Sequence, residues 1–225
     1  QRRWRQTAGS GGCAGPPPFS VLSVTVARIA IDIDSTLHPY WDQLAAVARR
    51  RFGVSLPYEE QRTWAISRLR PAQLAACVAE THEERLVLAA EPYPGAVEAL
   101  AAWRRAGHYL HITSHRSADA HAATERWLEQ NGVACDDLHC SSDKIARCVE
   151  LEIDLLIDDS PVNLERALDA GMRAATILHP WNAELCETED VVAAATWPEL
   201  AARLEPLLAP ARASLAGAGR HEPLH

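Results

Sequence analysis

The sequence predicts an α/β fold: a doubly wound parallel sheet with a small helical cap inserted after its first strand. Short apolar runs alternate with segments of helical periodicity, and this order is typical of parallel strands joined by right-handed crossovers. Polar residues follow directly after several of these runs. The length of 225 residues fits one large domain, or one domain that carries a small insert.

The predicted strands are apolar runs long enough for a buried strand of a parallel sheet. In chain order they are Val24–Ile31, His108–Ile112, Ile153–Ile157 and Arg173–Leu178. The roughly 31 residues between Thr113 and Lys144 leave room for one helix, a further short strand and turns.

The predicted helices show amphipathic spacing, with proline near their starts or glycine just past their ends. They are Asp42–Phe52, a helix after Pro94 and Gly95 that ends near Gly107, Ser117–Asn131, Asp143–Glu150, and a helix that begins at Ser160-Pro161 and ends at Gly171. Leu56–Glu91 is mostly helical in character, with interruptions at Pro57 and Pro71.

The spacing also predicts the domain organisation. About 80 residues separate Asp34 from Thr113, far more than one crossover helix needs. We therefore expect residues 24–38 and 92–208 to form the core domain and residues 39–91 a small helical cap. Residues 1–23 have no apolar stretch of the signal-peptide kind and are expected to be a disordered leader, and residues 209–225 a flexible tail.

Composition restricts the partners. The formal net charge is −8 without any run of basic residues, which argues against a nucleic-acid polymer or an anionic membrane as partner. No stretch reaches the roughly 18 apolar residues of a membrane span. Six scattered cysteines form no C-x-x-C, and with no secretory segment this favours a cytoplasmic protein. The oligomeric state stays open, a homodimer included.

Carboxylates follow two of the predicted strands. Asp32 and Asp34 come after the first strand, and Asp158 and Asp159 after Ile153–Ile157. The carboxyl ends of parallel strands meet at one edge of a sheet, where four carboxylates would repel one another without a cation. Oxygen-only ligands favour a hard ion, so the expected cofactor is Mg²⁺.

Lys144 is the single lysine of the chain, although lysine is ordinarily a common residue. It begins the helix before the second acid pair, so its side chain is expected to reach the carboxyl edge of the sheet. One lysine kept in an arginine-rich chain suggests a place that requires a compact ammonium group.

These residues, in this order, resemble the haloacid dehalogenase-like (HAD) superfamily of phosphohydrolases. Its D-x-D-x-T motif is matched by Asp32, Asp34 and Thr36, and its strand-ending hydroxyl residue by Thr113. Lys144 matches its lysine, and the apolar strand followed by Asp158 and Asp159 matches its last motif. The match covers about residues 24–206 and implies a Rossmann-like core.

The resemblance implies a phosphomonoester hydrolase that works through a phosphoaspartyl intermediate. Asp32 is then the nucleophile and Asp34 the general acid and base. Mg²⁺ is held by Asp32, the backbone carbonyl of Asp34 and Asp158, with Asp159 in support. The phosphoryl oxygens are bound by a set of three residues: Thr113, Ser114 and Lys144.

Two positions depart from the superfamily pattern. Ser35 stands where a glycine is usual, so its backbone is expected to be slightly strained. His115 shifts Arg116 by one residue from the usual Thr-x-Arg arrangement, which leaves the substrate role of Arg116 open.

The cap resembles that of the cytosolic 5'(3')-deoxyribonucleotidase-like branch. Its aromatic and arginine residues are candidate substrate contacts, Trp41 for a base or sugar and Arg68 for a second anionic group. The expected substrate is a small phosphorylated metabolite, and nucleoside monophosphates, sugar phosphates and phosphorylated side chains all stay open. Water and an alcohol are both open as acceptors.

Other classes of protein fit the order of motifs less well. A bacterial receiver domain places its acids before the Thr and Lys, whereas here Asp158 and Asp159 follow Lys144. Carbon dehalogenation does not need Asp34, a phosphonatase needs a cap lysine, and the P-loop and G-x-S-x-G motifs are absent from the sequence. The alternative that stays open is a non-catalytic, regulatory phosphate-binding protein of the same fold.

Overall fold

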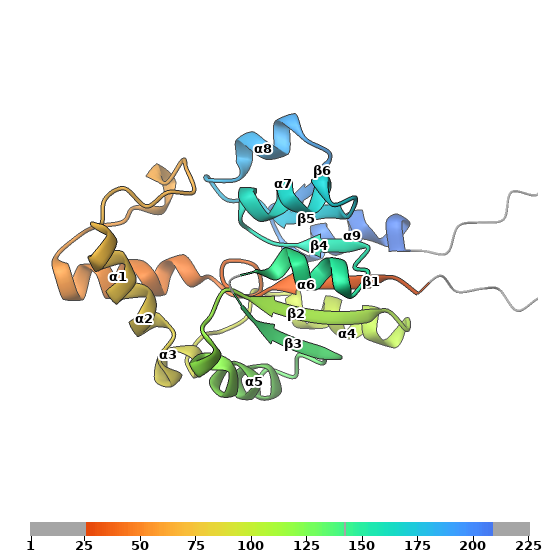
Figure 1. The fold of residues 1–225 in the computed structure, drawn as a ribbon, viewed down its shortest axis with the longest axis horizontal. Helices are drawn as coiled ribbons and strands as arrows, with labels where there is room; N and C mark the ends of the chain where they lie inside the picture. Colours follow the sequence, from red (N-terminus) through yellow and green to blue (C-terminus); the bar gives the residue numbers. More distant parts are fainter. Residues whose placement is uncertain (1–25, 142, 209–225) are drawn as a thin grey trace, which may run out of the picture.

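A six-stranded parallel sheet forms the centre of the molecule (Figure 1). The computed structural model describes residues 26–141 and 143–208. The strands are β1 (Arg28–Asp32), β2 (Tyr109–Ser114), β3 (Asp137–Cys140), β4 (Leu155–Ile157), β5 (Arg173–Ile177) and β6 (Val191–Ala194). Their order in the sheet, β3-β2-β1-β4-β5-β6, confirms the predicted doubly wound α/β fold.

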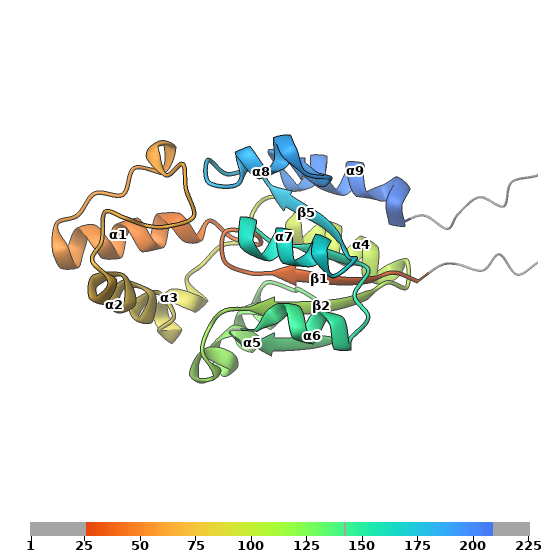
Figure 2. The ribbon, with the colours of Figure 1, turned by 45° about the horizontal axis from the view of Figure 1, so that its top comes forward.

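Helices cover both faces of this sheet (Figure 2). One face is covered by α4 (Ala96–Arg105), α5 (His121–Gln130) and α9 (Trp197–Leu208), and the other by α6 (Lys144–Glu150), α7 (Pro161–Asp169) and α8 (Ala183–Thr188). Strands enclosed on both sides must be apolar throughout, and Ile29, Ala30 and Ile31 are accordingly fully buried. Within the described residues, no helix is both long and apolar enough to cross a bilayer.

The first three helices after β1 stand together beyond the carboxyl edge of the sheet (Figure 1). This insert contains α1 (Tyr40–Phe52), the 3-10 turn η1 (Tyr58–Glu60), α2 (Pro71–Thr81) and α3 (Glu84–Leu88). It has a small apolar cluster of its own, and one member of that cluster, Trp181, comes from the loop after β5. The insert therefore contacts the core through that loop and also through α3, whose Val87 is part of the main core cluster.

The expectation that Leu56–Glu91 is mostly helical was wrong for residues 61–70, which are irregular. Gln61 explains part of the difference, because its side-chain amide donates to the carbonyls of Thr63 at 2.6 Å and Ala65 at 3.0 Å. These bonds satisfy backbone acceptors that a helix would otherwise pair.

Most other element boundaries agree with the prediction to within a few residues. The first strand is shorter than expected and begins at Arg28, while β2 extends to Ser114. The predicted helix Ser117–Asn131 begins with a 3-10 turn, η2 (Ala118–Ala120), before α5. The expected leader 1–23, the first two residues of the expected strand and the expected tail 209–225 lie outside the described residues.

His111 is a fully buried titratable residue in the middle of β2. Its Nδ1 lies 3.2 Å from Oδ2 of Asp137, but neither ring nitrogen has a hydrogen-bond partner of acceptable geometry among the described residues. Burial lowers the pKa of His111 to about 4. The ring is therefore neutral in the folded protein at pH 7.

This burial predicts a loss of stability in acid. The unfolded chain protonates this histidine near its ordinary pKa of 6.5, whereas the folded chain resists protonation down to about pH 4. Stability is thus fully present above pH 6.5 and falls as the pH drops from 6.5 toward 4, by up to about 3 kcal/mol. Urea unfolding at a series of pH values will show a smaller fall for His111→Gln than for the wild type; equal slopes would contradict the prediction.

Candidate active site

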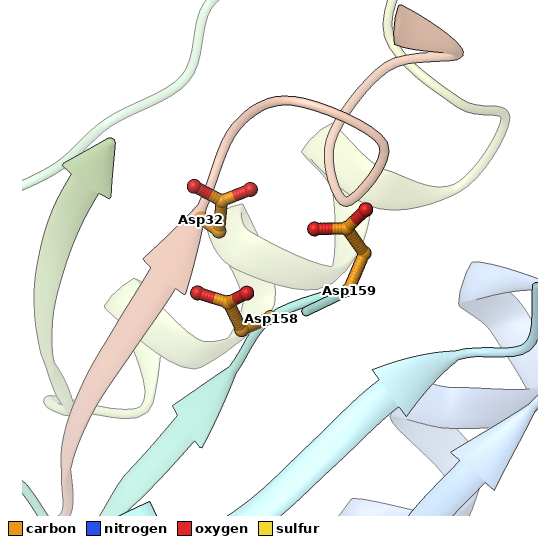
Figure 3. Close-up of side chains that lie close together, drawn as sticks. All are labelled: Asp32, Asp158 and Asp159. Carbon is orange, nitrogen blue, oxygen red and sulfur yellow. The ribbon is translucent and has the colours of Figure 1, made fainter. Parts of the chain in front are cut away.

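Three carboxylates meet at the carboxyl edge of the sheet (Figure 3). Asp32 is the last residue of β1, and Asp158 and Asp159 follow β4, the neighbour of β1 in the sheet. One oxygen from each of the three lies within 4.8 Å of the others, and all three residues are buried. The parallel pairing of β1 with β4 thus brings Asp32 together with the second acid pair that the sequence singled out.

Lys144 lies between two of these acids. Its Nζ donates to Oδ1 of Asp32 at 2.5 Å and to Oδ2 of Asp158 at 2.8 Å. Burial alone would lower the pKa of Lys144, but the adjacent Asp158 and Asp32 outweigh it and raise that pKa. The single lysine is therefore a buried ammonium that offsets part of the negative charge.

Asp158 is held in place by the start of the helix that follows it, α7. Its carboxylate accepts from the backbone N–H of Ser160 at 2.9 Å and from the side-chain amide of Asn163 at 3.1 Å. Ser160 also caps α7, with its hydroxyl accepting from the backbone N–H of Asn163. The predicted start of this helix at Ser160-Pro161 is confirmed, and it places the acid pair in a fixed turn.

Asp159 and Asp32 are destabilised in their ionised forms. Burial, followed by the charges of Asp32 and Asp158, raises the pKa of Asp159 well above its usual range. Burial also raises the pKa of Asp32 to about 7, although Lys144 opposes this shift. Among the described residues, no donor contacts the Asp159 carboxylate. A divalent cation with oxygen ligands fits this arrangement, because one ammonium does not balance three buried carboxylates.

Asp34 has a different environment. Arg116 donates to it through Nε at 3.1 Å and Nη2 at 2.6 Å, and His38 Nε2 lies 2.9 Å from Oδ1. His82 Nε2 lies 3.7 Å from Oδ2. Burial would raise the pKa of Asp34, but Arg116 and the two histidines outweigh it and hold that pKa well below its usual range. The Asp34 side chain is thus an ionised carboxylate outside the three-acid cluster. The expectation that the backbone carbonyl of Asp34 binds the metal stays a prediction.

The second motif is buried beneath this site. Thr113 pairs with Asp32 in the register of β1 and β2, and its Oγ1 is buried without a partner among the described residues. The Ser114 hydroxyl accepts from the backbone N–H of Arg116 at 3.2 Å. The Ser114 hydroxyl is therefore already hydrogen-bonded, whereas the Thr113 hydroxyl is available to bind a further group.

A cavity of about 390 Å³ opens from the acids into the insert. Its polar end contains Asp32, Asp34 and the acid pair after β4, and its other wall carries aromatic side chains together with leucine, isoleucine and valine. The aromatic lining residues are Tyr40, Trp41, Trp64 and Trp181. No lysine or arginine among the described residues lines this cavity.

Two of the three predicted substrate contacts do not line this cavity. Arg68 is not a lining residue, and its exposed guanidinium pairs with Glu60. Arg116 is buried and does not line the cavity, because its guanidinium is used by Asp34. Trp41 does line the cavity, and its Nε1 donates to the carbonyl of Leu56 at 3.1 Å.

Sequence reasoning missed the two histidines beside Asp34. His38 follows Asp34 by four residues, so the spacing within the loop after β1 was a usable signal. His82 lies after α2, 48 positions further along the chain than Asp34, and its approach depends on how the insert folds back. Trp181, in the loop after β5, also lies in the cavity wall.

Residues 25–208 match the family described as 5' nucleotidase, deoxy (pyrimidine), cytosolic type C. The chain belongs to this family. It is accordingly a HAD-like phosphatase of the nucleotidase kind, and the predicted resemblance is confirmed. No curated protein gives a significant match to the chain.

Solved structures share the fold of this nucleotidase-family chain at low identity. A HAD family hydrolase from Deinococcus radiodurans with bound phosphate and sodium has a TM-score of 0.60 and 19% identity, over 83% of this chain and 98% of that one. CbbY from Rhodobacter sphaeroides with xylulose-1,5-bisphosphate has a TM-score of 0.54 and 17% identity, over 77% and 96%. A predicted phosphoglycolate phosphatase from Haemophilus somnus gives 0.57 and 16%, over 78% and 96%.

The charge imbalance at Asp159 gives a prediction about metal and stability. Asp159→Asn removes one buried carboxylate whose pKa is raised in the fold, so the metal-free protein should gain about 1 kcal/mol of stability at pH 7. The increase in stability on adding Mg²⁺ should shrink, because one ligand is weakened. Urea unfolding in EDTA and in MgCl₂ measures both effects.

Asp169→Asn, an exposed change at the end of α7, the helix that follows Asp159, is the matched control and should alter neither quantity. A less stable metal-free Asp159→Asn protein with an unchanged response to Mg²⁺ would refute the assignment of Asp159 to the metal site.

Proposed function

We propose that the protein is a Mg²⁺-dependent phosphomonoester hydrolase that forms a phosphoaspartyl intermediate on Asp32. The observation that carries this proposal is the position of Asp32 at the end of β1, between the ammonium of Lys144 and the open cavity. A carboxylate placed in this way reaches a phosphate in the cavity while Lys144 stays within contact of the transferred group.

The proposed reaction has two half-reactions. In the first, an Asp32 oxygen bonds to phosphorus as the ester P–O bond breaks, and the leaving oxygen takes a proton from the protonated form of Asp34. In the second, water bonds to phosphorus and gives a proton back to Asp34, the Asp32–phosphorus bond breaks and inorganic phosphate is released. Lys144, Thr113 and Ser114 are the proposed partners of the phosphoryl oxygens, and the unpartnered Thr113 hydroxyl supports this role.

Asp34 is the proposed proton-transfer group, because it follows the nucleophile by two residues and lines the same cavity. Its pairing with Arg116 and His38 supports the ionised form, which is the form that takes a proton from the attacking water. Arg116 is thus proposed to set the charge of Asp34 and not to bind substrate.

Three carboxylates and one backbone carbonyl are the proposed metal ligands: Asp32, Asp158, Asp159 and the carbonyl of Asp34. When bound, Mg²⁺ would supply positive charge that reduces the repulsion between a carboxylate nucleophile and an anionic phosphate. The phosphate itself would be positioned by the chain's own residues.

The cavity supports a monophosphate with a flat, uncharged leaving group. Trp41, Trp64 and Trp181 offer rings for stacking, whereas a second phosphate, as in the bisphosphate bound to CbbY, would meet no lysine or arginine of the described residues. A nucleoside monophosphate has the required chemistry, and the family description names a deoxypyrimidine nucleotidase. Such a substrate agrees with a cytosolic location, and residues 39–91 are proposed to act as the cap.

The first test is hydrolysis of p-nitrophenyl phosphate with and without Mg²⁺. We expect turnover that requires the metal and is abolished in Asp32→Asn, because an amide cannot form the acyl phosphate. Circular dichroism should show that the variant remains folded. Retained turnover in Asp32→Asn would exclude the phosphoaspartyl mechanism, and a wild type without turnover or Mg²⁺ binding would favour the non-catalytic alternative.

The aromatic wall predicts a selective effect on substrate binding. Trp64→Ala should raise KM for a nucleoside 5'-monophosphate about tenfold, as expected for loss of one stacking contact, and leave kcat nearly unchanged. With glycerol phosphate, which has no ring, KM should stay the same. Equal increases in KM for both substrates would show that Trp64 shapes the cavity without stacking on the leaving group.

A further inference from the structure

The loop that follows Asp32 is held at three successive carbonyls. The Leu37 carbonyl accepts from the backbone N–H of Tyr93 at 2.7 Å, and the Thr36 carbonyl accepts from Nε1 of Trp197 at 2.7 Å. The Ser35 carbonyl accepts from Nε2 of His179, also at 2.7 Å. Each partner comes from a distant part of the chain, so the rest of the fold holds this loop in addition to its local hydrogen bonds to the Ile33 carbonyl.

Ser35 is the residue of this loop that needs such support. Its φ is +61°, in the left-handed region where a glycine would meet no steric cost. The peptide that joins Asp34 to Ser35 lies directly before this turn. A change in the turn would therefore move the Asp34 carboxyl relative to Asp32.

His179 uses both of its ring nitrogens. Because Nε2 donates to Ser35, Nδ1 accepts from the hydroxyl of Tyr58, at 2.7 Å. The ring is buried and stacks on Trp181 with centroids 4.4 Å apart and an interplanar angle of 4°. Burial lowers the pKa of His179 to about 4, so the ring is neutral at pH 7 and has the one donor and one acceptor that these two contacts require.

Asn182 fixes the loop that carries His179. Its side-chain oxygen accepts from the backbone N–H of His179 at 2.8 Å, and its side-chain amide donates to the carbonyls of Asp159 at 3.2 Å and Ile177 at 3.1 Å. Asn182 is fully buried. Asn182 thus fixes the backbone that carries the His179 ring and also contacts the backbone of the second acid pair.

We propose that His179 is a positioning residue, which holds Ser35 in its left-handed turn and links that turn to the insert through Tyr58. Tyr58 belongs to η1 of the insert, whereas Tyr93 and Trp197, which hold the two neighbouring carbonyls, lie outside it. Of the three anchors, the one at Ser35 therefore depends on where the insert lies. The position of the Asp34 carboxyl relative to Asp32 is in this way coupled to the position of the insert against the core.

The proposal rests on the proposed function, and a double-mutant cycle tests it. His179→Phe keeps a ring on Trp181 but removes both nitrogens. We expect this change to lower kcat for p-nitrophenyl phosphate about tenfold in the wild-type background, a loss of about 1.4 kcal/mol. In the Ser35→Gly background the same change should lower kcat less than about threefold, because glycine adopts the positive φ without support.

Equal losses in the two backgrounds would overturn the proposal, because they would mean that His179 only shapes the wall of the cavity. Thermal unfolding of each variant, followed by circular dichroism, shows that a loss of kcat is not a loss of folded protein. Should the His179→Phe protein fail to fold, Tyr58→Phe tests the same link by removing a single hydroxyl.

Tyr58→Phe should lower kcat by about threefold, as expected for one hydrogen bond. Tyr93→Phe is the matched control and should have no effect, because the Tyr93 hydroxyl has no hydrogen-bond partner within residues 26–141 and 143–208, and its backbone contact with Leu37 is kept. An equal effect of the two substitutions, or no effect of either, would overturn the link to the insert.

A spectroscopic measurement separates this proposal from the proposed function. The Thr36 amide belongs to the same peptide as the Ser35 carbonyl, so its ¹⁵N chemical shift reports on the hydrogen bond from His179. We expect Tyr58→Phe to shift this resonance and Tyr93→Phe to leave it in place, whether or not the protein hydrolyses phosphate. An unmoved Thr36 resonance in Tyr58→Phe would overturn the coupling, while an inactive wild type would overturn the proposed function alone.

Discussion

The structure depends on how excess negative charge is accommodated at one edge of a buried sheet. Asp32, Asp158 and Asp159 are enclosed by apolar strands and helices, where an isolated carboxylate is strongly disfavoured. Lys144 satisfies two of them and leaves Asp159 without a donor among the described residues. The same burial that destabilises the acids strengthens their attraction for a cation, so the charge imbalance that weakens the metal-free fold is also what creates the site.

The carboxyl groups of Asp34 and Asp159, both near the carboxyl edge of the sheet, have pKa values shifted in opposite directions because their neighbours differ. Asp34 is paired with Arg116 and lies beside two histidines, so its pKa is held low, whereas Asp159 faces other acids and its pKa is raised. Desolvation acts in the same direction on both, so the partner decides the outcome. This difference supports separate roles, with Asp34 for proton transfer and Asp159 for the cation.

The acids and the lysine could be predicted from the sequence because each of them occupies a strand end or a helix start, and those places are encoded locally. The partner of Asp34 could not be predicted in this way: Arg116 lies 82 residues away along the chain, and the motif itself suggested a substrate contact. The irregular structure of residues 61–70 was not predicted for another reason. The Gln61 side chain takes the place of helical hydrogen bonds, and the spacing of apolar residues carries no information about such a bond.

The insert and the core share one apolar cluster, and this has a consequence for selectivity. Trp181 belongs to the core loop after β5, yet it packs with Trp41 of α1, with ring centroids 5.4 Å apart. Its Nε1 also donates to the Asp159 carbonyl at 3.2 Å. The aromatic wall of the cavity therefore contains residues of both the insert and the core. Trp181 joins this wall to the backbone of the acid pair after β4. A leaving group of the proposed kind would contact the insert and the core together, so binding energy from a part of the substrate remote from phosphorus would help to hold the reacting groups in place.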